Sequence, residues 1–398
     1  MCSLVRGSTD DDGVAMRDAG GQPEPLLAGR DLVKIFRGRP SKRYSLFRTK
    51  IRAVNDVTIS IDAGKTVGIA GESGCGKTTL ARLMVGALPP DDGQIYFRGR
   101  DVAKLRGEER KTYRAAVQAV FQDPRSAINP RLSVAASIAE PLVRQKDQTK
   151  ADLGAAVDEL LTAVGLEEGV RDNFPHQLSG GMLQRVAIAQ ALASDPKIIV
   201  LDEPVSALDV SIRAQIMNLL QDLRRDYGVS FFMISHDLAT LRYLSDEVGV
   251  MYLGKLVEFG PAELVFDQPQ HPYTAALLSA APEIRRDSAA KGSQRIVLPG
   301  DMPSPEEPTQ GCSFHSRCPL WQKLGRPSVC TDEDPALHST GGRHRVACHF
   351  WDATPTTLLP TTTPSSDGHD VTEAAGPRLD PATGQDHARE DNWADGPW

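Results

Sequence analysis

A glycine-rich segment at residues 71–78, with the sequence GESGCGKT, constrains this chain of 398 residues more than any other feature. Its spacing, Gly-x4-Gly-Lys-Thr, is the P-loop pattern, in which backbone N–H groups surround phosphate oxygens at the start of a helix. At average composition the pattern has roughly a one per cent chance of arising in a chain this long. Residues 66–70 indicate a buried strand entering the loop, and residues 79–85 the helix leaving it. The segment is therefore predicted to bind nucleotide phosphates.

Within this loop, two side chains have the clearest expected roles. Lys77 would reach the β and γ phosphates of the nucleotide, and Thr78 would hold Mg²⁺. A glycine turn that binds no nucleotide is the alternative interpretation. The residues predicted to contact the nucleotide are Gly71, Ser73, Gly74, Cys75, Gly76, Lys77, Thr78 and Thr79.

A second segment, IIVLDEP at 198–204, is an apolar run that ends in two carboxylates. This pattern is typical of a central parallel strand whose carboxyl end faces the crevice in which ligands bind. Asp202 would support the Mg²⁺ shell. Glu203 would polarise the attacking water, because phosphoryl transfer needs positioned charge and an oriented nucleophile. Such strands are common on their own, but together with a P-loop this one predicts ATP hydrolysis.

A third segment, LSGGM at 178–182, is followed by Gln184, Arg185 and a helical run to Leu192. The Ser-Gly-Gly step is a nest of backbone donors before a helix. In this context it resembles the signature of the ATP-binding-cassette proteins, and the resemblance covers about 27–260. It implies an α/β fold, a P-loop NTPase cassette with a mixed sheet core and an inserted helical subdomain.

The same resemblance implies that two cassettes pair head to tail. ATP would then lie between the P-loop of one cassette and Ser179, Gly180 and Gly181 of the other. Asp209, in the segment SALD at 206–209, resembles a residue of the loop that crosses to the other subunit.

Three further residues resemble members of the family's nucleotide site. Phe36 resembles the aromatic on which adenine stacks, and a core residue is the alternative interpretation. Gln122, in FQDP at 121–124, resembles the glutamine that touches Mg²⁺ and water and senses the membrane partner. His236 resembles the switch histidine at the γ-phosphate, and a satisfied polar residue at a strand end is the alternative for both Gln122 and His236. The predicted catalytic residues are Glu203, His236 and Gln122, and the predicted Mg²⁺ ligands are Thr78, Gln122 and Asp202.

Helical periodicity dominates two stretches of the cassette. Residues from about 102 to 194 are predicted to form the inserted helical subdomain. Residues 211–227 are predicted to form an amphipathic helix with its apolar face in the core. The residues of that face are Ile212, Ile216, Leu219, Leu220 and Leu223.

Four cysteines fall within 37 residues near the end of the chain, at Cys312, Cys318, Cys330 and Cys348. Clustered cysteines in a cytosolic chain favour metal over disulfides. Their intervals of 5, 11 and 17 residues lack the C-x2-C hooks of zinc ribbons. Together with HPYT at 271–274 and LPGDMP at 298–303, they resemble the C-terminal extension of oligopeptide and dipeptide importer ATPases, at about 262–350. That resemblance implies a [4Fe–4S] cluster on the four cysteines, with zinc and unliganded buried thiols as alternatives.

The two ends of the chain are predicted to be disordered. Segment 351–398 holds nine acidic residues and two arginines, which accounts for a charge of −7, equal to the formal net charge of the whole chain. Residues 1–26 are similar in character. No apolar run approaches the roughly 18 residues of a membrane span, and the N-terminus lacks a secretory signal. The protein is therefore expected to be cytosolic, with any membrane role exerted through partners.

A basic run lies between Asp31 and Asp56, without an acidic residue inside it. It is predicted to form an extended loop near the nucleotide that touches anionic headgroups or an acidic partner, and a solvated loop is the alternative. Its members are Lys34, Arg37, Arg39, Lys42, Arg43, Arg48, Lys50 and Arg52.

Taken together, these resemblances imply an ATP-hydrolysing subunit of a peptide importer that acts at the cytoplasmic face of the cell membrane with ATP and Mg²⁺. Its implied partners are a second cassette ATPase, two transmembrane permease subunits and an extracytoplasmic binding protein, without nucleic acid. Such importers have two ATPase subunits, conventionally labelled D and F. Cys75 and the arginine-rich basic run near the N-terminus resemble the F-type subunit more than the D-type. Import of nickel, glutathione or another small solute is the alternative. A cassette ATPase that acts on DNA is disfavoured, because it would need a long coiled coil for which the chain has no room between its motifs. A ribosome-associated factor is disfavoured because it usually carries two P-loops, whereas this sequence has one.

Overall fold

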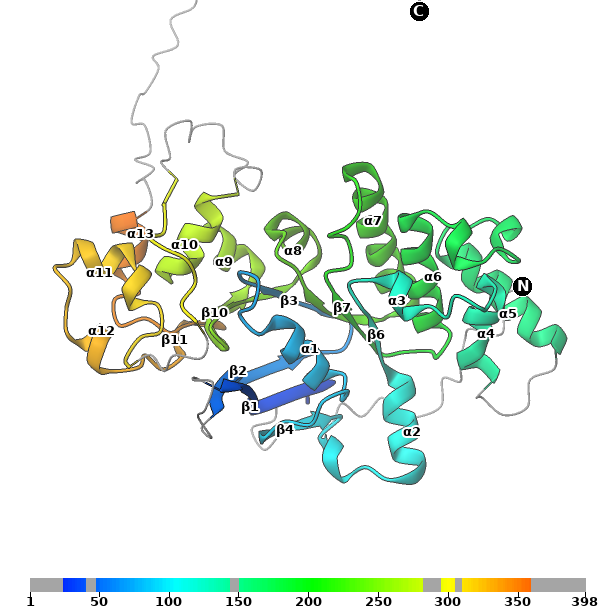
Figure 1. Cartoon of the computed structure of the whole chain (residues 1–398), viewed down its shortest axis with the longest axis horizontal. Coiled ribbons are helices and arrows are strands. Elements are labelled where there is room, and N and C mark those ends of the chain that lie inside the picture. Colours follow the sequence, from blue (N-terminus) through cyan, green and yellow to red (C-terminus); the bar gives the residue numbers. More distant parts are fainter. Residues whose placement is uncertain (1–23, 41–47, 144–149, 282–294, 305–309, 359–398) are drawn as a thin grey trace, which may run out of the picture. The chain divides into compact units, whose positions relative to one another are not determined.

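The computed structural model describes residues 24–40, 48–143, 150–281, 295–304 and 310–358 (Figure 1). An antiparallel sheet has the strand order β2-β1-β4-β5. Its strands are β1 (Leu27–Pro40), β2 (Arg48–Ile61), β4 (Asp92–Phe97) and β5 (Arg100–Asp101).

An eight-stranded mixed sheet carries the order β11-β12-β10-β9-β3-β8-β7-β6. The strands from β9 to β6 run parallel to one another, whereas β10, β12 and β11 continue the sheet antiparallel. Their bounds are β3 (Thr66–Ala70), β6 (Val117–Val120), β7 (Ile198–Asp202), β8 (Ser230–Ile234), β9 (Glu247–Tyr252), β10 (Lys255–Pro261), β11 (His338–Gly341) and β12 (His344–Val346).

The middle strands are buried on both faces, as expected for parallel strands covered by helices. All five residues of β3, of β7 and of β8 are buried. The helices are α1 (Lys77–Met84), α2 (Gly107–Ala116), α3 (Pro124–Ala127), α4 (Val134–Val143), α5 (Lys150–Ala163), α6 (Gly180–Leu192), α7 (Val210–Tyr227), α8 (Leu238–Leu244), α9 (Ala262–Asp267), α10 (Pro272–Ser279), α11 (Pro319–Lys323), α12 (Val329–Asp332) and α13 (Ala353–Leu358).

Helix α1 packs between the two sheets (Figure 1). Leu80 and Leu83 of α1 share one apolar cluster with Val54 and Ile59 of β2 and with Ile234 of β8. This packing fixes the start of α1, and therefore the P-loop that precedes it, against both sheets.

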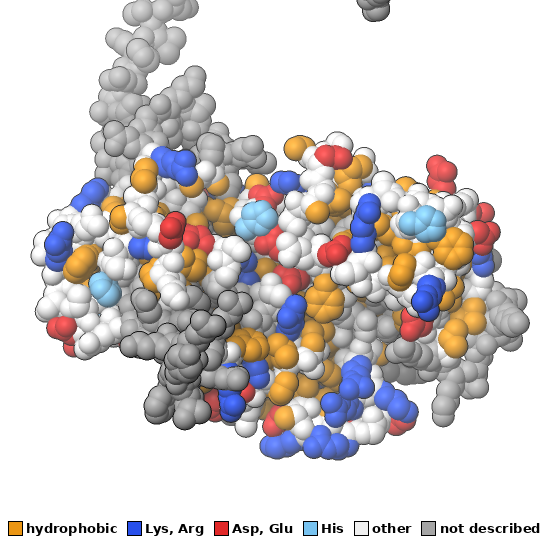
Figure 2. Space-filling model, viewed as in Figure 1, with side chains coloured by type: hydrophobic (Ala, Val, Ile, Leu, Met, Phe, Trp, Pro, Cys, Tyr) orange, Lys and Arg blue, Asp and Glu red, His pale blue; other side chains and the backbone are white. Residues whose placement is uncertain are grey.

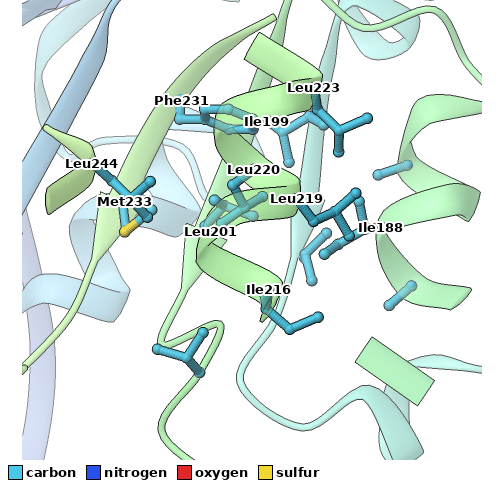
Figure 3. Close-up of a cluster of buried hydrophobic side chains, with 14 of the residues drawn as sticks. Ile188, Ile199, Leu201, Ile216, Leu219, Leu220, Leu223, Phe231, Met233 and Leu244 are labelled. Carbon is cyan, nitrogen blue, oxygen red and sulfur yellow. The ribbon is translucent and has the colours of Figure 1, made fainter. Parts of the chain in front are cut away.

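Helix α7 confirms the amphipathic helix predicted at 211–227. Asp209 caps its start by accepting a hydrogen bond from the Ile212 amide at 2.9 Å, and Gly228 ends it with φ 65°. Four of the five predicted core positions are buried, whereas Ile212 is only partly buried. Figure 3 shows the apolar face of α7 against the strands β7 and β8 and helix α6. The labelled residues are Ile188, Ile199, Leu201, Ile216, Leu219, Leu220, Leu223, Phe231, Met233 and Leu244.

The prediction that residues 102–194 form one helical subdomain is only partly right. Helices α4, α5 and α6 pack on one another there, but β6 lies inside the same stretch and pairs in parallel with β7. Strand β6 is only four residues long and directly follows the polar helix α2. Four residues are too few for a strand pattern of hydrophobic residues to stand out in the sequence. Because β6 belongs to the main sheet, Gln122 follows directly from a core strand.

The prediction of an extended loop at 34–52 is wrong for the residues of this basic run that the structure describes. Its described residues belong to β1 and β2, which pair antiparallel, with Phe36 opposite Ile51. Lys50 and Arg52 are exposed, whereas Lys34 is buried and donates to the Pro89 carbonyl and to Asp91. Lys42 and Arg43 lie outside the described residues. The alternation of basic and apolar residues in β2 is therefore a strand pattern.

The C-terminal extension continues the cassette sheet. Strand β12 pairs with β10 at Phe259 opposite Arg345, and buried Glu258 accepts hydrogen bonds from the amides of Gln270 and His271 at 2.8 and 3.0 Å. His344 also contacts Glu258, at 2.8 Å. The predicted region 262–350 is therefore built onto the cassette through its last two strands.

The predicted disordered tail began too early in the chain. Helix α13 occupies 353–358, and Thr354 in it is buried, so the prediction of disorder is wrong for these residues. Segments 1–23 and 359–398 lie outside the described residues. Among the described helices, none is long and apolar enough to cross a membrane.

Candidate ATP site

The P-loop owes its shape to glycines at the junction of β3 and α1. Gly76 precedes α1 with φ 111°, and a Cβ added there would lie 1.9 Å from the Ala53 carbonyl oxygen. Gly71 has φ 148°, and its added Cβ would lie 2.3 Å from the Met251 carbonyl oxygen. Side chains are excluded at both positions. The glycines therefore let the loop pass close to these two carbonyl groups before it enters α1, and the N-terminus of a helix is where backbone amides bind phosphate.

Lys77 is buried against the loop that it belongs to. Its Nζ donates to the carbonyl oxygens of Gly71 at 2.8 Å and Glu72 at 2.9 Å. The Cys75 sulfur lies 3.9 Å from the same Nζ, and burial is the main cause that raises the pKa of the Cys75 thiol. The Lys77 ammonium is therefore held at the loop by backbone carbonyls, at the position from which phosphate oxygens could compete for it.

Thr78 and Asp202 bring the P-loop and the carboxylate strand together. Thr78 Oγ1 donates to Asp202 Oδ1 at 3.2 Å, although the two residues are 124 positions apart. Asp202 is 3% exposed, and burial raises the pKa of its carboxyl. A cation bound beside it would offset that burial cost, since an opposite charge favours the ionised carboxylate. The hydroxyl and carboxylate form an oxygen donor set of the kind that Mg²⁺ prefers.

Glu203 and His236 form a direct pair at the ends of β7 and β8. The Nδ1 atom of His236 lies 2.5 Å from Oε2 of Glu203, and the His236 side chain is 62% exposed. Glu203 itself has φ 54° and donates its amide to the Ile234 carbonyl. This left-handed backbone conformation is uncommon for a non-glycine residue. It turns the chain immediately after β7, where Glu203 reaches the P-loop cavity.

A cavity of about 480 Å³ lies in front of the loop, within the size range of small-molecule sites. It unites P-loop residues with both strand-end residues and with Gln122. Its lining is Ala53, Ser73, Gly74, Gly76, Lys77, Thr78, Thr79, Gln122, Glu203 and His236.

Phe36 and Asp202 are absent from that lining, as are Gly71 and the buried Cys75. Phe36 is 39% exposed on β1, opposite Ile51, two residues before the cavity-lining Ala53. Its role as the adenine-stacking residue stays a prediction.

The signature residues lie apart from this cavity. Ser179 caps α6, where its Oγ accepts a hydrogen bond from the Met182 amide at 3.3 Å. Ser179 and Gly180 are exposed, whereas Gly181 packs under Ile212, whose Cγ2 would lie 2.5 Å from an added Cβ. None of these three residues belongs to the described lining of the P-loop cavity.

Asp209 likewise lies outside that lining and caps α7 from an exposed position. Its carboxylate accepts from the Ile212 amide and the Ser211 hydroxyl, and the amide bond is the main cause that lowers its pKa.

The four late cysteines surround one cavity of about 20 Å³. All four are unpaired as thiols, and burial raises the pKa of Cys312 to about 11 and that of Cys318 to about 12. Burial raises the pKa of Cys330 and Cys348 as well. Across the part of the chain that the structure describes, no group of three or more His, Cys, Asp or Glu residues is arranged to hold a metal ion. The cysteines have therefore converged, but without an assembled ligand set.

A larger cavity, of about 1000 Å³, was not predicted from the sequence. It is lined by the segment that follows α1, by β4, α2 and β6, and by Phe121, which is 37% exposed. Figure 2 shows Lys and Arg side chains gathered along the lower edge of the molecule, where α2 and the turn between β4 and β5 lie. The exposed basic residues of this part are Arg98, Arg100, Lys104, Arg106, Arg110, Lys111 and Arg114.

Contacts between the P-loop and the C-terminal extension were also missed. Arg317 pairs with Glu72 at 3.2 Å, and the Tyr273 hydroxyl accepts from the Glu72 amide at 2.9 Å. The residues of each pair are more than 200 positions apart, so local sequence patterns carry no signal for them.

Comparison with known proteins agrees with this geometry. Residues 54–206 match the ABC transporter family, and residues 257–323 match the C-terminal region of oligopeptide/dipeptide transporters. The oligopeptide transport ATP-binding protein AppF of Bacillus subtilis is 43% identical over 332 residues, covering 82% of this chain and 98% of the relative. The dipeptide transport ATP-binding protein DppF of Escherichia coli is 41% identical, covering 82% and 94%.

A third relative, the oligopeptide transport ATP-binding protein OppF of Salmonella typhimurium, is 42% identical and covers 82% of this chain and 96% of its own. Among solved structures, the ATP-binding cassette MJ0796, a dimer bound to ADP and phosphate, is 27% identical with a TM-score of 0.53. That match covers 60% of this chain and 99% of MJ0796. The chain belongs to the ATP-binding-cassette family, in the group of oligopeptide and dipeptide transport ATP-binding proteins, and it is an ATP hydrolase.

Proposed function

We propose that this chain powers the import of peptides across the cytoplasmic membrane by hydrolysing ATP. The observation that carries the proposal is the convergence of the P-loop, Gln122, Glu203 and His236 on one cavity. The extension built onto the cassette supports peptides as the cargo, because its matching region is the one found in oligopeptide and dipeptide transporters.

The roles of the site residues follow from their positions. Lys77 would exchange its two carbonyl partners for the β and γ phosphates, with charge-assisted hydrogen bonds as the gain. Thr78 and Asp202 would hold Mg²⁺, which neutralises phosphate charge when bound. Glu203 would orient and polarise the attacking water, and its bond to His236 would hold the carboxylate in place. Gln122, which lines the same cavity, would contact Mg²⁺ and water.

A second cassette would complete the site. Ser179 and Gly180 are exposed at the start of α6, where backbone amides can receive phosphate oxygens. Because they lie outside the described lining of their own P-loop cavity, the phosphates that they bind would belong to another chain. Asp209, exposed at the start of α7, would lie in the same contact. The resulting closure on ATP and opening after hydrolysis would drive the permease.

The larger cavity is the proposed docking surface for a transmembrane permease subunit. Phe121 borders this cavity, and the next residue, Gln122, lines the ATP cavity. A permease segment seated against Phe121 would therefore act on a residue adjacent to one of the predicted catalytic groups. With a permease on this surface, the protein would lie at the cytoplasmic face of the membrane, and an extracytoplasmic binding protein would select the cargo.

Capture from native membranes tests this assignment. Tagged Glu203→Gln protein, loaded with ATP and Mg²⁺, is expected to retain two multi-span permeases and a second cassette ATPase, identified by mass spectrometry. Adding Phe121→Asp should remove the permeases because a charge would be buried in an apolar contact. Leu324→Asp is the matched control, since Leu324 is 41% exposed on the extension. Recovery of ribosomes or nucleic-acid proteins in place of permeases would contradict the importer.

The four cysteines are proposed to hold a [4Fe–4S] cluster. This proposal is supported by the position of the four cysteines, which line one small cavity and form no disulfides. They are Cys312, Cys318, Cys330 and Cys348. Four thiolates are the usual ligands of such a cluster. Because the protonated thiols must lose their protons on binding, the cluster would form with proton release. Its function would be structural, tying the loop at 312–318 to α12 and to the end of β12.

Replacing Cys312 and Cys318 with serine is expected to abolish iron binding. The Tm should fall by about 5–10 °C, which corresponds to a few kcal/mol of lost stability for a domain of this size. Iron, acid-labile sulfide and Tm would be measured on anaerobically purified protein. Ser313→Ala, on the same loop, should keep the iron. Stoichiometric zinc without iron or sulfide in the native protein would overturn the cluster assignment.

A further inference from the structure

Glu72, the second residue of the P-loop, makes hydrogen bonds through its amide, its carbonyl and its carboxylate. Its amide donates to the Tyr273 hydroxyl at 2.9 Å, and its carbonyl accepts from Lys77 Nζ at 2.9 Å. Its carboxylate accepts from both terminal nitrogens of Arg317, at 3.2 and 3.4 Å. Two of the three partners come from the C-terminal extension. The loop that faces the phosphates is thus positioned from outside the cassette.

Arg317 is built into the extension and aimed at the loop. The residue is 7% exposed, and its amide donates to the Phe314 carbonyl at 3.0 Å. Phe314 packs against Tyr252 and Tyr273, with ring centroids 5.2 and 5.4 Å apart. The main chain that carries Arg317 is therefore anchored to a buried aromatic cluster, and its guanidinium contacts Glu72. Cys318 follows Arg317 directly in the chain.

The charge of Glu72 makes this contact important for nucleotide binding. A carboxylate within a phosphate-binding loop repels the phosphates, because like charges disfavour each other strongly where water is partly excluded. The Glu72 side chain is 29% exposed, so solvent screens its charge only in part. The Arg317 guanidinium offsets this charge, since both of its terminal nitrogens donate to the Glu72 carboxylate. Loss of Arg317 would leave a free negative charge beside the site.

We propose that Arg317 is a positioning residue of the ATP site, through which the C-terminal extension sets nucleotide affinity. Arg317 acts on Glu72 and not on the nucleotide itself. The inference rests on nucleotide binding at the P-loop and does not depend on the cargo, the permease or the metal content of the cysteine cavity.

The test is MgADP binding to the full-length chain, measured by calorimetry, together with Tm. Arg317→Ala is expected to weaken MgADP binding about tenfold. Arg317→Gln, which keeps most of the side-chain volume, should give the same loss, and Arg317→Lys should recover most of the affinity because it retains the charge. Lys323→Gln removes a positive charge from exposed α11 and is the matched control.

The double variant separates positioning from a general structural role. If Arg317 acts by neutralising Glu72, Glu72→Ala combined with Arg317→Ala should bind MgADP as tightly as Glu72→Ala alone. A double variant as weak as Arg317→Ala would overturn the proposal, as would unchanged affinity in folded Arg317→Ala or Arg317→Gln. Lys77→Ala serves as a control for the site. If it weakens MgADP binding relative to the wild type, the measured binding takes place at the P-loop. Failure of the importer assignment would leave these results unchanged.

Discussion

Replacing Glu203 with glutamine is expected to lower the rate of ATP hydrolysis by about 10²- to 10⁴-fold, the usual contribution of a positioned general base. The substitution keeps the shape of the side chain and its place at the end of β7, but it removes the negative charge that polarises water. Lys77, Thr78 and Asp202 are unchanged, so MgATP binding should persist. The variant should accumulate as a closed, ATP-bound dimer, measured by size-exclusion chromatography with and without ATP.

The pairing of Glu203 with His236 sharpens this experiment. Glutamine can still accept a hydrogen bond from His236 Nδ1, which lies 2.5 Å from the Glu203 carboxylate. The comparison of Glu203→Gln with the wild type therefore tests the charge of the side chain while its position is kept. Glu168→Gln, an exposed glutamate in the short turn at Glu168–Val170, is the matched control and should hydrolyse ATP at the wild-type rate. Normal turnover in Glu203→Gln would remove Glu203 from its assigned role.

The nucleotide site was predictable because its parts are local in sequence. The strand, glycine loop and helix at 66–84 follow one another without interruption, and each has its own pattern. The apolar run at 198–202 ends in carboxylates, so its place at the edge of a parallel sheet could also be inferred. Thr78 and Asp202 then meet because the loop before Thr78 leaves the carboxyl end of β3, and Asp202 is the last residue of β7. General rules of α/β sheets supply that step.

Features that depend on pairing between distant segments could not be predicted in this way. The basic residues of β2 concealed a strand whose exposed face they occupy, as Lys50 and Arg52 show. The extension looked like a separate region because β11 and β12 are short, and the pairing of β12 with β10 has no local signal. The contact between Glu72 and Arg317 joins residues 245 positions apart. Only the folded chain brings these groups together.

This difference matters for function. The residues predicted from the sequence are proposed to bind and hydrolyse ATP within the cassette, whereas the residues that sequence reasoning missed lie at its contact with the C-terminal extension or on its proposed permease surface. Phe121 lines the proposed permease surface, and Arg317 lies between the cysteine loop and the P-loop. The chemistry is thus encoded in contiguous motifs, and its proposed control in long-range contacts.

Replacing Lys77 with alanine is expected to weaken MgATP binding by about 10- to 150-fold. Hydrogen bonds to charged groups contribute about 1.5–3 kcal/mol each, and each 1.4 kcal/mol or so is a factor of ten in affinity. The loss has two sources. The phosphates lose a buried cation, and the carbonyls of Gly71 and Glu72 lose the donor that holds them at 2.8 and 2.9 Å. Calorimetric titration of the full-length chain with MgADP and MgATP measures the effect.

Lys77→Met separates the loss of the charged hydrogen bonds from the loss of packing, because methionine fills much of the space of the lysine side chain without its charge. It should bind nucleotide as weakly as Lys77→Ala. Lys104→Ala, at a lysine whose side chain is 80% exposed, should bind like wild type. Because Lys77 is proposed to contact the β and γ phosphates, ATP should lose more affinity than ADP in both Lys77 variants. Equal losses for the two nucleotides would place Lys77 on the loop alone, as a residue that shapes the carbonyls and does not reach the γ-phosphate.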